Sequence, residues 1–257
     1  YWSETLSEWH KQGLPKTVKD EAAAYAYFGI ENWRYAPVDV MGMRPAFEHK
    51  ILEETDEYQT YRDGNGCTAQ INKQGHKSIP HYIDFLLKDR RAWEEEYKPK
   101  LQFADDRLPK NWKKLAEEYR HRDDPLCIGI GSLVGTPRNW IGFENIALMV
   151  YDDPKLLEEI VETLCTLVCT TLEKVLPDVE FDFGAGWEDI CFNSGPIVGY
   201  DFMRNVVMPR YQRITGLLRK HGCFIAWTDC DGNILPILDC FYDGGINCCF
   251  PVEVNGG

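Results

Sequence analysis

From residue 127 onward the chain alternates short apolar runs with amphipathic helical segments, and this alternation most constrains the fold. Apolar runs that end near glycines are typical of buried strands. The strand-like runs are 127–135, 179–186, 223–232 and 246–257. The helix-like segments are 154–176, 200–222 and 233–245. Strands separated by helices pair in parallel through right-handed crossovers, so we predict an α/β fold with a parallel sheet.

The helical segments carry recognisable start and stop signals. Asp153 can cap the helix over 154–176, and Pro154 suits its first turn. The predicted buried face of this helix consists of Leu156, Ile160, Leu164, Leu167 and Val168. For the helix over 200–222 we expect a kink or restart at Pro209 and an end at Gly222.

The first half of the chain has weaker signals. We expect a helix over 16–29 that ends at Gly29, followed by a short strand and loop over 36–45. Residues 58–73 predict a hairpin around the turn sequence Asp-Gly-Asn-Gly. Residues 80–122 are rich in Lys, Arg, Glu and Trp and predict solvated helices.

Composition narrows the class of protein. The chain has 257 residues, which suits one large domain, with 44% hydrophobic and 27% charged residues. Its net charge of -13 argues against a nucleic-acid partner, which requires a basic surface. Since no apolar run is long enough to span a membrane, we expect no membrane partner. Ten cysteines without a C-x-x-C pair favour reduced thiols and a cytoplasmic location.

The number of strand-like units bears on the architecture. Six can be counted when the early strand and the hairpin are included, whereas a (β/α)₈ barrel needs eight. The fold is therefore either an open parallel sheet or a barrel whose last one or two β/α units are absent from this chain.

In both architectures, function gathers at the C-terminal ends of the strands. Four predicted strand ends are polar here. They offer Arg138, Asn139 and Glu144; Trp187, Glu188 and Asp189; Asp229 and Asp231; and Glu253 and Asn255.

Asp229 and Asp231 form the most informative pair. Alternation along a strand places Trp227, Asp229 and Asp231 on one face, with the carboxylates about 7 Å apart. Two such carboxylates can share a metal or a proton, or bind substrate, and their repulsion raises the pKa of one of them unless a cation lies between them. The alternative is that Asp231, with Gly232 and Asn233, forms a turn that caps the next helix.

The segment Trp187-Glu188-Asp189 has two interpretations as well. It follows a predicted strand and two glycines, which places it with the candidate site residues. Alternatively, it is a solvated loop that holds one packed tryptophan.

Four stretches together resemble the uroporphyrinogen decarboxylase superfamily. They are "PAFEHKILEETDEYQTYRDGNG" (45–66), "GTPRNWIGFENIALMVYDDPKLLEEIVETL" (135–164), "WEDICFNSGPIVGYDFMRNVVMPRYQRI" (187–214) and "TDCDGNILPIL" (228–238). The resemblance covers most of the chain and implies a (β/α)₈ barrel, which favours the second architecture. It implies one domain over 1–257, with a helical segment over 1–35, barrel units from about 36 and a missing C-terminal part.

The superfamily contains two chemistries. True uroporphyrinogen decarboxylases remove acetate carboxyls from a tetrapyrrole without a cofactor and carry an Arg-Gln-x-Gly-Arg block. The corresponding stretch here is "GMRPAFEHK", which keeps only Arg44. The other branch moves methyl groups between a corrinoid protein and an acceptor, with zinc held by His-x-Cys and a later Cys. The absence of the second arginine and of Gln-x-Gly, together with the net charge of -13, favours this second branch. Asp229-x-Asp231 stands at its His-x-Cys position, and oxygen ligands in place of a thiolate argue against activation of a thiol.

The resemblance therefore implies a corrinoid-linked methyltransferase with a small methylated substrate or acceptor. Asp229, Asp231, Glu188 and Asp189 are the predicted catalytic residues. The predicted substrate-binding residues are Trp187, Trp227, Arg44, Glu253 and Asn233. Asp229 and Asp231 would bind zinc or another divalent cation, with a third ligand beyond residue 257. The partner would be a corrinoid-binding protein, and a homodimer is compatible with the sequence.

Two other functions stay open at this point. One is uroporphyrinogen decarboxylation in porphyrin biosynthesis, which needs no cofactor. The other is a barrel that binds a corrinoid or porphyrin without catalysis.

Overall fold

The centre of the molecule is a five-stranded parallel sheet. The computed structural model describes residues 5–74 and 80–253 of the chain. The sheet has the order β1-β6-β7-β10-β11, and every neighbouring pair is parallel, as predicted. Its strands are β1 (Arg34–Tyr35), β6 (Leu126–Gly131), β7 (Phe183–Trp187), β10 (Ile225–Asp229) and β11 (Cys248–Phe250). Within the described residues the sheet is open, with β1 and β11 at its edges, and the eight-stranded barrel stays a prediction.

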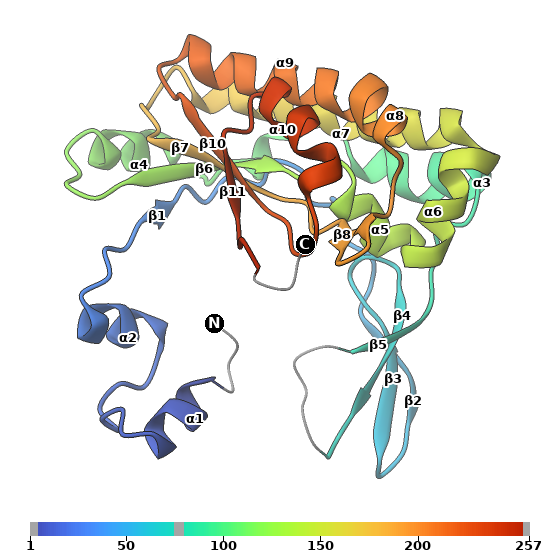
Figure 1. Cartoon of the computed structure of the whole chain (residues 1–257), viewed down its shortest axis with the longest axis horizontal. Helices are drawn as coiled ribbons and strands as arrows, with labels where there is room; N and C mark the ends of the chain where they lie inside the picture. The colour runs from blue at the N-terminus through green and yellow to red at the C-terminus, as the bar shows by residue number, and fades with distance from the viewer. Residues whose placement is uncertain (1–4, 75–79, 254–257) are drawn as a thin grey trace.

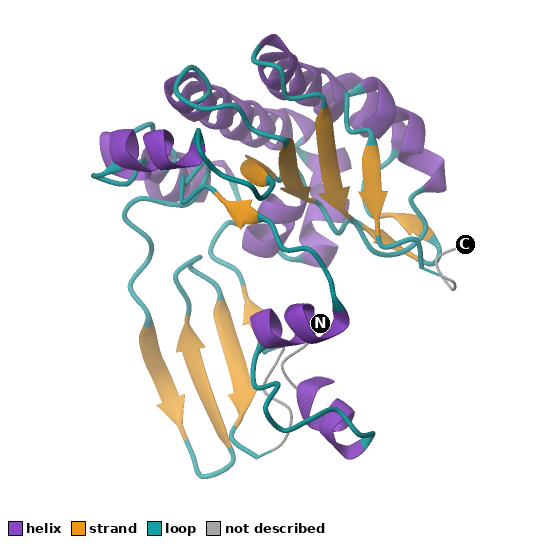
Figure 2. Cartoon of the chain, turned by 90° about the vertical axis from the view of Figure 1, so that its left-hand side faces the viewer, coloured by secondary structure: helices purple, strands orange, loops and turns teal. Residues whose placement is uncertain are grey.

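Helices cover one face of this sheet. Figure 1 shows α7, α9 and α10 along that face, and Figure 2 shows the strands beneath the helix layer. The helices that follow β6 are α5 (Gly135–Ile141), α6 (Phe143–Asp152), α7 (Pro154–Val175), α8 (Tyr200–Phe202), α9 (Met208–Lys220) and α10 (Leu238–Asp243). Leu126, Ile128 and Ile130 of β6 are buried under this layer and form part of the main core.

The predicted helix signals are confirmed in detail. The Leu156 amide donates to Asp153 Oδ1 over 3.0 Å, which caps α7. All five residues of the predicted face of α7 are buried. The helix over 200–222 restarts as predicted: a π-helical segment, η4 (Met203–Val207), is followed by α9 with Pro209 in its first turn. The chain leaves α9 through Gly222 at φ +84°.

The opposite face of the sheet is partly exposed and aromatic. In β10 the side chains alternate, with Ala226 and Thr228 buried and Trp227 and Asp229 partly exposed. Four rings on this face follow one another in contact, with centroid distances of 6.1, 6.5 and 4.7 Å. These rings belong to Trp33, Phe183, Trp227 and Phe250. The predicted common face of Trp227 and Asp229 is therefore confirmed, whereas Asp231 lies beyond the strand and is exposed.

A second sheet lies apart from the first and is antiparallel (Figure 1). Its strands, in spatial order, are β2 (Lys50–Glu54), β3 (Tyr58–Arg62), β4 (Thr68–Asn72) and β5 (His81–Asp84). The hairpin expected over 58–73 is β3–β4, and its turn is held by Asp63, whose Oδ1 accepts the amides of Asn65 and Cys67. The hairpin was wrongly counted as a unit of the parallel sheet, because its strands pair only with β2 and β5.

Two further sequence predictions were wrong. The early strand is β1, so it precedes the range 36–45, which has no strand. The range 80–122 begins with β5, and Trp93 and Tyr97 within it are buried rather than solvated. Tyr97 packs on Trp140 of α5 with ring centroids 5.6 Å apart, and this contact draws the segment into the core. Its helical segments are α3 (Arg90–Ala92), η1 (Trp93–Tyr97), η2 (Lys98–Lys100), η3 (Asp105–Arg107) and α4 (Trp112–Tyr119).

Two short helices precede β1, namely α1 (Thr5–Lys11) and α2 (Glu21–Phe28). Helix α2 begins five residues later than expected from the alanine-rich run, because Asp20 accepts the Ala23 amide as its N-cap over 2.8 Å. It ends at Gly29 in the left-handed conformation, as predicted. In the described part of the chain, no helix combines the length and apolarity needed to cross a membrane.

Candidate functional site

The C-terminal ends of β7 and β10 are joined by their main chains. The carbonyl oxygen of Asp229 accepts the amide of Glu188 over 2.8 Å and the amide of Asp189 over 3.2 Å. In the register of the two strands, Asp229 lies beside Trp187. Predicted site residues from two strands are thereby brought together at one edge of the sheet.

Glu188 is buried at the N-terminal end of α5. Its Oε1 accepts the Leu133 amide over 2.7 Å, and its Oε2 accepts the amides of Val134 and Gly135 over 3.0 and 2.6 Å. Ser132 Oγ lies 3.3 Å from Oε2, and the Tyr211 hydroxyl donates to Oε1. A carboxylate at a helix N-terminus is favoured by the exposed amides and the helix dipole.

Every oxygen of Glu188 is thus engaged within the protein. Burial raises the pKa of Glu188, while the Tyr211 hydroxyl and the three amides oppose that rise. Burial and the charge of Glu188 hold the pKa of Tyr211 well above 10, so this hydroxyl acts as a donor. These contacts bury Glu188, unlike the solvated loop that the sequence left open, and its predicted catalytic role stays a prediction.

Gly135 explains how closely α5 approaches the end of β7. A Cβ atom at this position would lie 2.0 Å from the main-chain oxygen of Glu188. Only glycine permits that approach, so the position of the buried Glu188 requires glycine at residue 135. Tyr211 was not predicted as a partner, because nothing in a helical sequence reveals which distant carboxylate its hydroxyl meets.

Asp189 is held by Arg138 of α5. Arg138 Nη1 donates to the main-chain oxygen of Asp189 and lies 3.3 Å from Asp189 Oδ2. The Arg138 guanidinium also lies over the Trp187 ring, 5.1 Å from its centroid. Asp189 has φ +46°, the left-handed conformation that is costly for a non-glycine residue. Arg138 therefore fixes both the backbone and the carboxylate of Asp189.

Asp229 and Asp231 differ from Glu188 because no described residue donates a hydrogen bond to either carboxylate. Burial, followed by the charges of Asp231 and Asp189, raises the pKa of Asp229. Burial, followed by the charges of Asp189 and Glu253, raises the pKa of Asp231. Both groups thus keep a proton to a higher pH than a free aspartate does.

The loop after β10 packs against the segment after β7. The Gly232 amide donates to Glu253 Oε2 over 2.6 Å, which ties this loop to the segment after β11. A Cβ atom on Gly232 would lie 2.7 Å from the main chain of Cys191. Asn233 Oδ1 accepts the Leu235 amide over 3.1 Å at the start of the short helix η5 (Leu235–Ile237). The N-cap of η5 is Ile234, without a side-chain cap bond, so the alternative in which Asp231 caps this helix is wrong.

These segments enclose a pocket of about 370 Å³, which we call the reacting pocket. Asp189, Asp231 and Glu253, one from the end of each of three neighbouring strands, line it. The other lining residues are Arg138, Phe143, Ile190, Cys191, Phe192, Asn193, Ile197 and Gly232. Asp229 lies two residues before Asp231 and does not line the pocket, while Glu188 is buried behind it. Asn255 lies outside the described residues.

The two predicted tryptophans lie on the exposed face of the sheet. Trp187 stacks under Arg138, and Trp227 packs between Phe183 and Phe250. Since the register of β7 and β10 places Trp187 beside Asp229, both rings flank the half-buried carboxylate.

Arg44 is engaged elsewhere. Its Nε lies 2.7 Å from Asp39 Oδ2, and its Nη1 lies 3.1 Å from Asp106 Oδ2. Because both partners are acidic, the charge of Arg44 is neutralised within the protein. Its loop reaches the end of β6, where the Ser132 amide lies 3.1 Å from Met41 Sδ.

Metal ligands are incomplete among residues 5–74 and 80–253. No three His, Cys, Asp or Glu side chains there are grouped so that they could hold a metal ion. Asp229 and Asp231 supply two carboxylate ligands, so the metal assignment stays a prediction.

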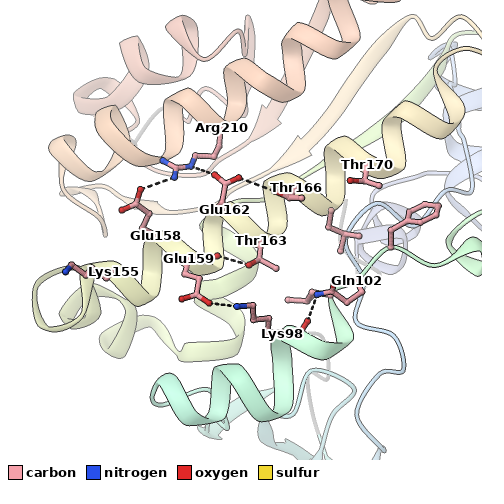
Figure 3. A pocket seen from close by; sticks show the side chains of 13 residues that line it. Lys98, Gln102, Lys155, Glu158, Glu159, Glu162, Thr163, Thr166, Thr170 and Arg210 are labelled. Carbon is pink, nitrogen blue, oxygen red and sulfur yellow. Dashed lines mark hydrogen bonds and ion pairs between the residues drawn. The ribbon is translucent and has the colours of Figure 1, made fainter.

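A different pocket, of about 560 Å³, lies on the outer side of α7 (Figure 3). Its carboxylates pair with cationic side chains of the protein. Lys98 and Arg90 lower the pKa of Glu159 to about 2. Arg210 pairs with Glu158 and Glu162. Because these charges neutralise one another, we interpret this pocket as an ion-pair network between helices.

Comparisons with known proteins gave little. No protein-family model matches the chain, and no curated protein matches it. Among solved structures, the chain is similar to a methyltransferase from Methanosarcina mazei, with a TM-score of 0.49 and 13% sequence identity. The similarity covers 90% of this chain, which spans 60% of the length of that one.

Proposed function

We propose that the chain is a methyltransferase of the uroporphyrinogen decarboxylase superfamily. It would move a methyl group between a small methylated substrate or acceptor and a corrinoid protein. The observation that carries this proposal is the pair Asp229 and Asp231 at the end of a parallel strand, beside a pocket, without hydrogen-bond donors from the described residues. Neighbouring carboxylates without cationic partners repel one another, and groups whose pKa is raised in this way concentrate at functional sites.

In this proposal these residues hold and donate a proton. A corrinoid on the partner protein would supply the electron pair that takes the methyl group. The bond between the methyl carbon and the substrate's oxygen or nitrogen breaks, and the leaving atom keeps its electrons and needs a proton. Asp231 lines the reacting pocket and its pKa is raised, so we assign it the role of the general acid that gives this proton.

The other predicted residues take supporting roles in this proposal. Asp189, fixed by Arg138, and Glu253, bonded to Gly232, would orient the substrate at the two sides of Asp231. Asp229 would share the proton with Asp231, and Trp187 and Trp227 would form an apolar wall. Glu188 would act through the position of α5 rather than by touching the substrate.

The described residues would give a metal ion two carboxylate ligands, from Asp229 and Asp231, and no third ligand. The proposed proton transfer from Asp231 needs no metal ion.

Tetrapyrrole decarboxylation is the competing function. It would require cations for the carboxylate side chains of the substrate, yet Arg44 is neutralised by Asp39 and Asp106. The pocket-lining cation Arg138 is likewise paired with Asp189.

Two assays on the full chain separate the possibilities. In the first, the protein is incubated with reduced cobalamin and methanol, dimethyl ether or methylamine, and the loss of the reduced form is followed by absorbance. In the second, it is incubated with uroporphyrinogen. Methyl transfer from one of the donors supports the proposal. Formation of coproporphyrinogen, or tight cobalamin binding without any turnover, contradicts it.

A further inference from the structure

The reacting pocket has a neighbour with which it shares two lining residues, Arg138 and Phe143. This neighbour, which we call the aromatic pocket, has a volume of about 610 Å³. Its other lining residues are Tyr82, Ile83, Asp84, Phe85, Asn139, Gly142, Glu144 and Asn145. It lies where the antiparallel sheet meets the start of α6, and its volume is in the range of small-molecule sites, about 300–1,000 Å³.

A row of aromatic rings extends from the aromatic pocket to the reacting pocket. Tyr82 and Phe85 stack with centroids 6.1 Å apart and an interplanar angle of 23°. Phe85 packs on Gly142, where a Cβ atom would lie 2.5 Å from the ring. Phe143, the next residue, meets Phe192 edge-on at 4.6 Å, and Phe192 lines the reacting pocket.

Three of these rings are exposed, whereas Phe85 is partly buried. The exposed fractions are 43% for Tyr82, 40% for Phe143 and 49% for Phe192. Adjacent exposed rings that line concave surface are typical of binding sites, because an apolar ligand removes them from water.

The charges at the aromatic pocket are largely paired. Asp84 Oδ1 lies 2.7 Å from Lys88 Nζ, and Arg138 is paired with Asp189. The side-chain nitrogen of Asn145 donates to the main-chain oxygen of Ile141 over 2.9 Å. Glu144 is exposed and has no ion-pair partner among the described residues, so one negative charge remains at this pocket. The rings provide an apolar part of the lining, which favours an uncharged, planar molecule over an anion.

We propose that the two pockets form one substrate site, in which the aromatic pocket holds a planar, uncharged body of the methyl donor. The methyl-bearing end would lie in the reacting pocket, near Asp231. This inference rests on the proposed methyl transfer, and it names the substrate class: a methyl group carried by an aromatic body rather than by a one-carbon alcohol or amine.

Binding without turnover tests the inference. Methoxybenzene and its non-planar match, methoxycyclohexane, are titrated into the full chain by calorimetry, with no corrinoid present. We expect methoxybenzene to bind more tightly. We expect Phe143→Leu and Tyr82→Leu each to weaken its binding by roughly 3- to 10-fold, the size of one aromatic contact. Phe224→Leu is the matched control, since Phe224 is 64% exposed and lines neither pocket, and it should leave the affinity unchanged.

The outcomes separate this inference from the proposed function. Absence of methoxybenzene binding, or binding that neither variant weakens, overturns the inference, even if methanol serves as a methyl donor. If instead the two variants weaken a complex with a corrinoid protein and methoxybenzene does not bind, the rings dock a protein and the inference is wrong. If methoxybenzene binds, the two variants weaken that binding and no methyl transfer is found, the inference that the pocket holds a planar, uncharged ligand stands. The proposed methyl transfer is then wrong.

Discussion

The Asp189 amide donates to the main-chain oxygen of Asp229 over 3.2 Å, so the ends of two parallel strands are linked beyond their last paired residues. This bond fixes the spacing of the Asp189 and Asp229 side chains without neutralising either. The main chain therefore sets the arrangement of these two acidic strand ends, where Arg138 pairs with Asp189 and no described residue donates a hydrogen bond to the Asp229 carboxylate.

Glu188→Gln should destabilise the fold strongly. The substitution places an amide group against the amides at the start of α5, so at least one buried donor loses its acceptor. We expect a loss of about 2–4 kcal/mol in the free energy of unfolding. The measurement is urea denaturation of the variant and the unmodified chain.

Tyr211→Phe is the matched variant for that experiment. It removes one donor and leaves Glu188 with three main-chain amides, so the expected loss is smaller, about 1–2 kcal/mol. A Glu188→Gln variant as stable as the unmodified chain would show that the carboxylate does not hold α5.

Asp229→Asn should stabilise the protein at neutral pH. Burial and two neighbouring carboxylates raise the pKa of Asp229 above its usual 3.8, so ionisation is less favourable in the folded state than in the unfolded one. Stability from this group is present below pH 3.8 and is lost as the pH rises through the folded pKa. The gain at pH 7 should stay under about 1 kcal/mol, since water screens a half-exposed carboxylate.

Thermal melts of the unmodified chain and Asp229→Asn from pH 3 to pH 8 check this prediction. The difference in Tm should appear as the pH rises above 4 and vanish at the acidic end. A variant that melts below the unmodified chain at pH 7 would mean that Asp229 has a stabilising partner.

Glu159→Gln should show the opposite pH dependence. Hydrogen bonds from Lys98 and Arg90 lower the pKa of Glu159 to about 2, so its contribution is present above pH 4.5 and is lost as the pH falls toward 2. At pH 7 we expect the variant to lose about 1 kcal/mol, because the group is partly exposed. Denaturation curves at pH 7 and pH 2.5 provide the test, and equal losses at both would exclude the ion pairs as the cause.

The metal assignment has its own test. If Asp229 and Asp231 bind a divalent cation, the unmodified full chain should contain metal after purification, and Asp231→Ala should contain at least tenfold less. Elemental analysis measures both. Equal metal contents would remove Asp231 as a ligand, and the general-acid role would be unaffected.

The second half of the fold was predictable because its signals are local. Asp153 and Pro154 mark the start of α7, and the spacing of apolar residues from Leu156 to Val168 gives its buried face. The parallel pairing followed from the alternation of strands and helices. By contrast, β5 and the burial of Trp93 depend on partners far along the chain, and no local pattern of Lys, Glu and Trp reveals them.

The site was predictable to the level of its strand ends. Asp189, Asp231 and Glu253 meet in one pocket because parallel strands bring their C-terminal ends to a common edge. The alternation of side chains along a strand did not reveal that the Glu188 side chain is buried. Its partners are main-chain amides at the start of α5, which no side-chain pattern indicates. Nor did the sequence indicate that Phe143 stands between two pockets.

The most direct test of the central claim is methyl transfer by Asp231→Asn, with Asp201→Asn as the matched control on an exposed part of α8. The rate is the loss of reduced cobalamin on addition of the donor that the unmodified chain uses. We expect Asp231→Asn to be slower by about 100-fold or more, because the leaving atom loses its proton source, while Asp201→Asn keeps the full rate. An Asp231→Asn variant that folds and transfers methyl groups as fast as the unmodified chain would contradict the account.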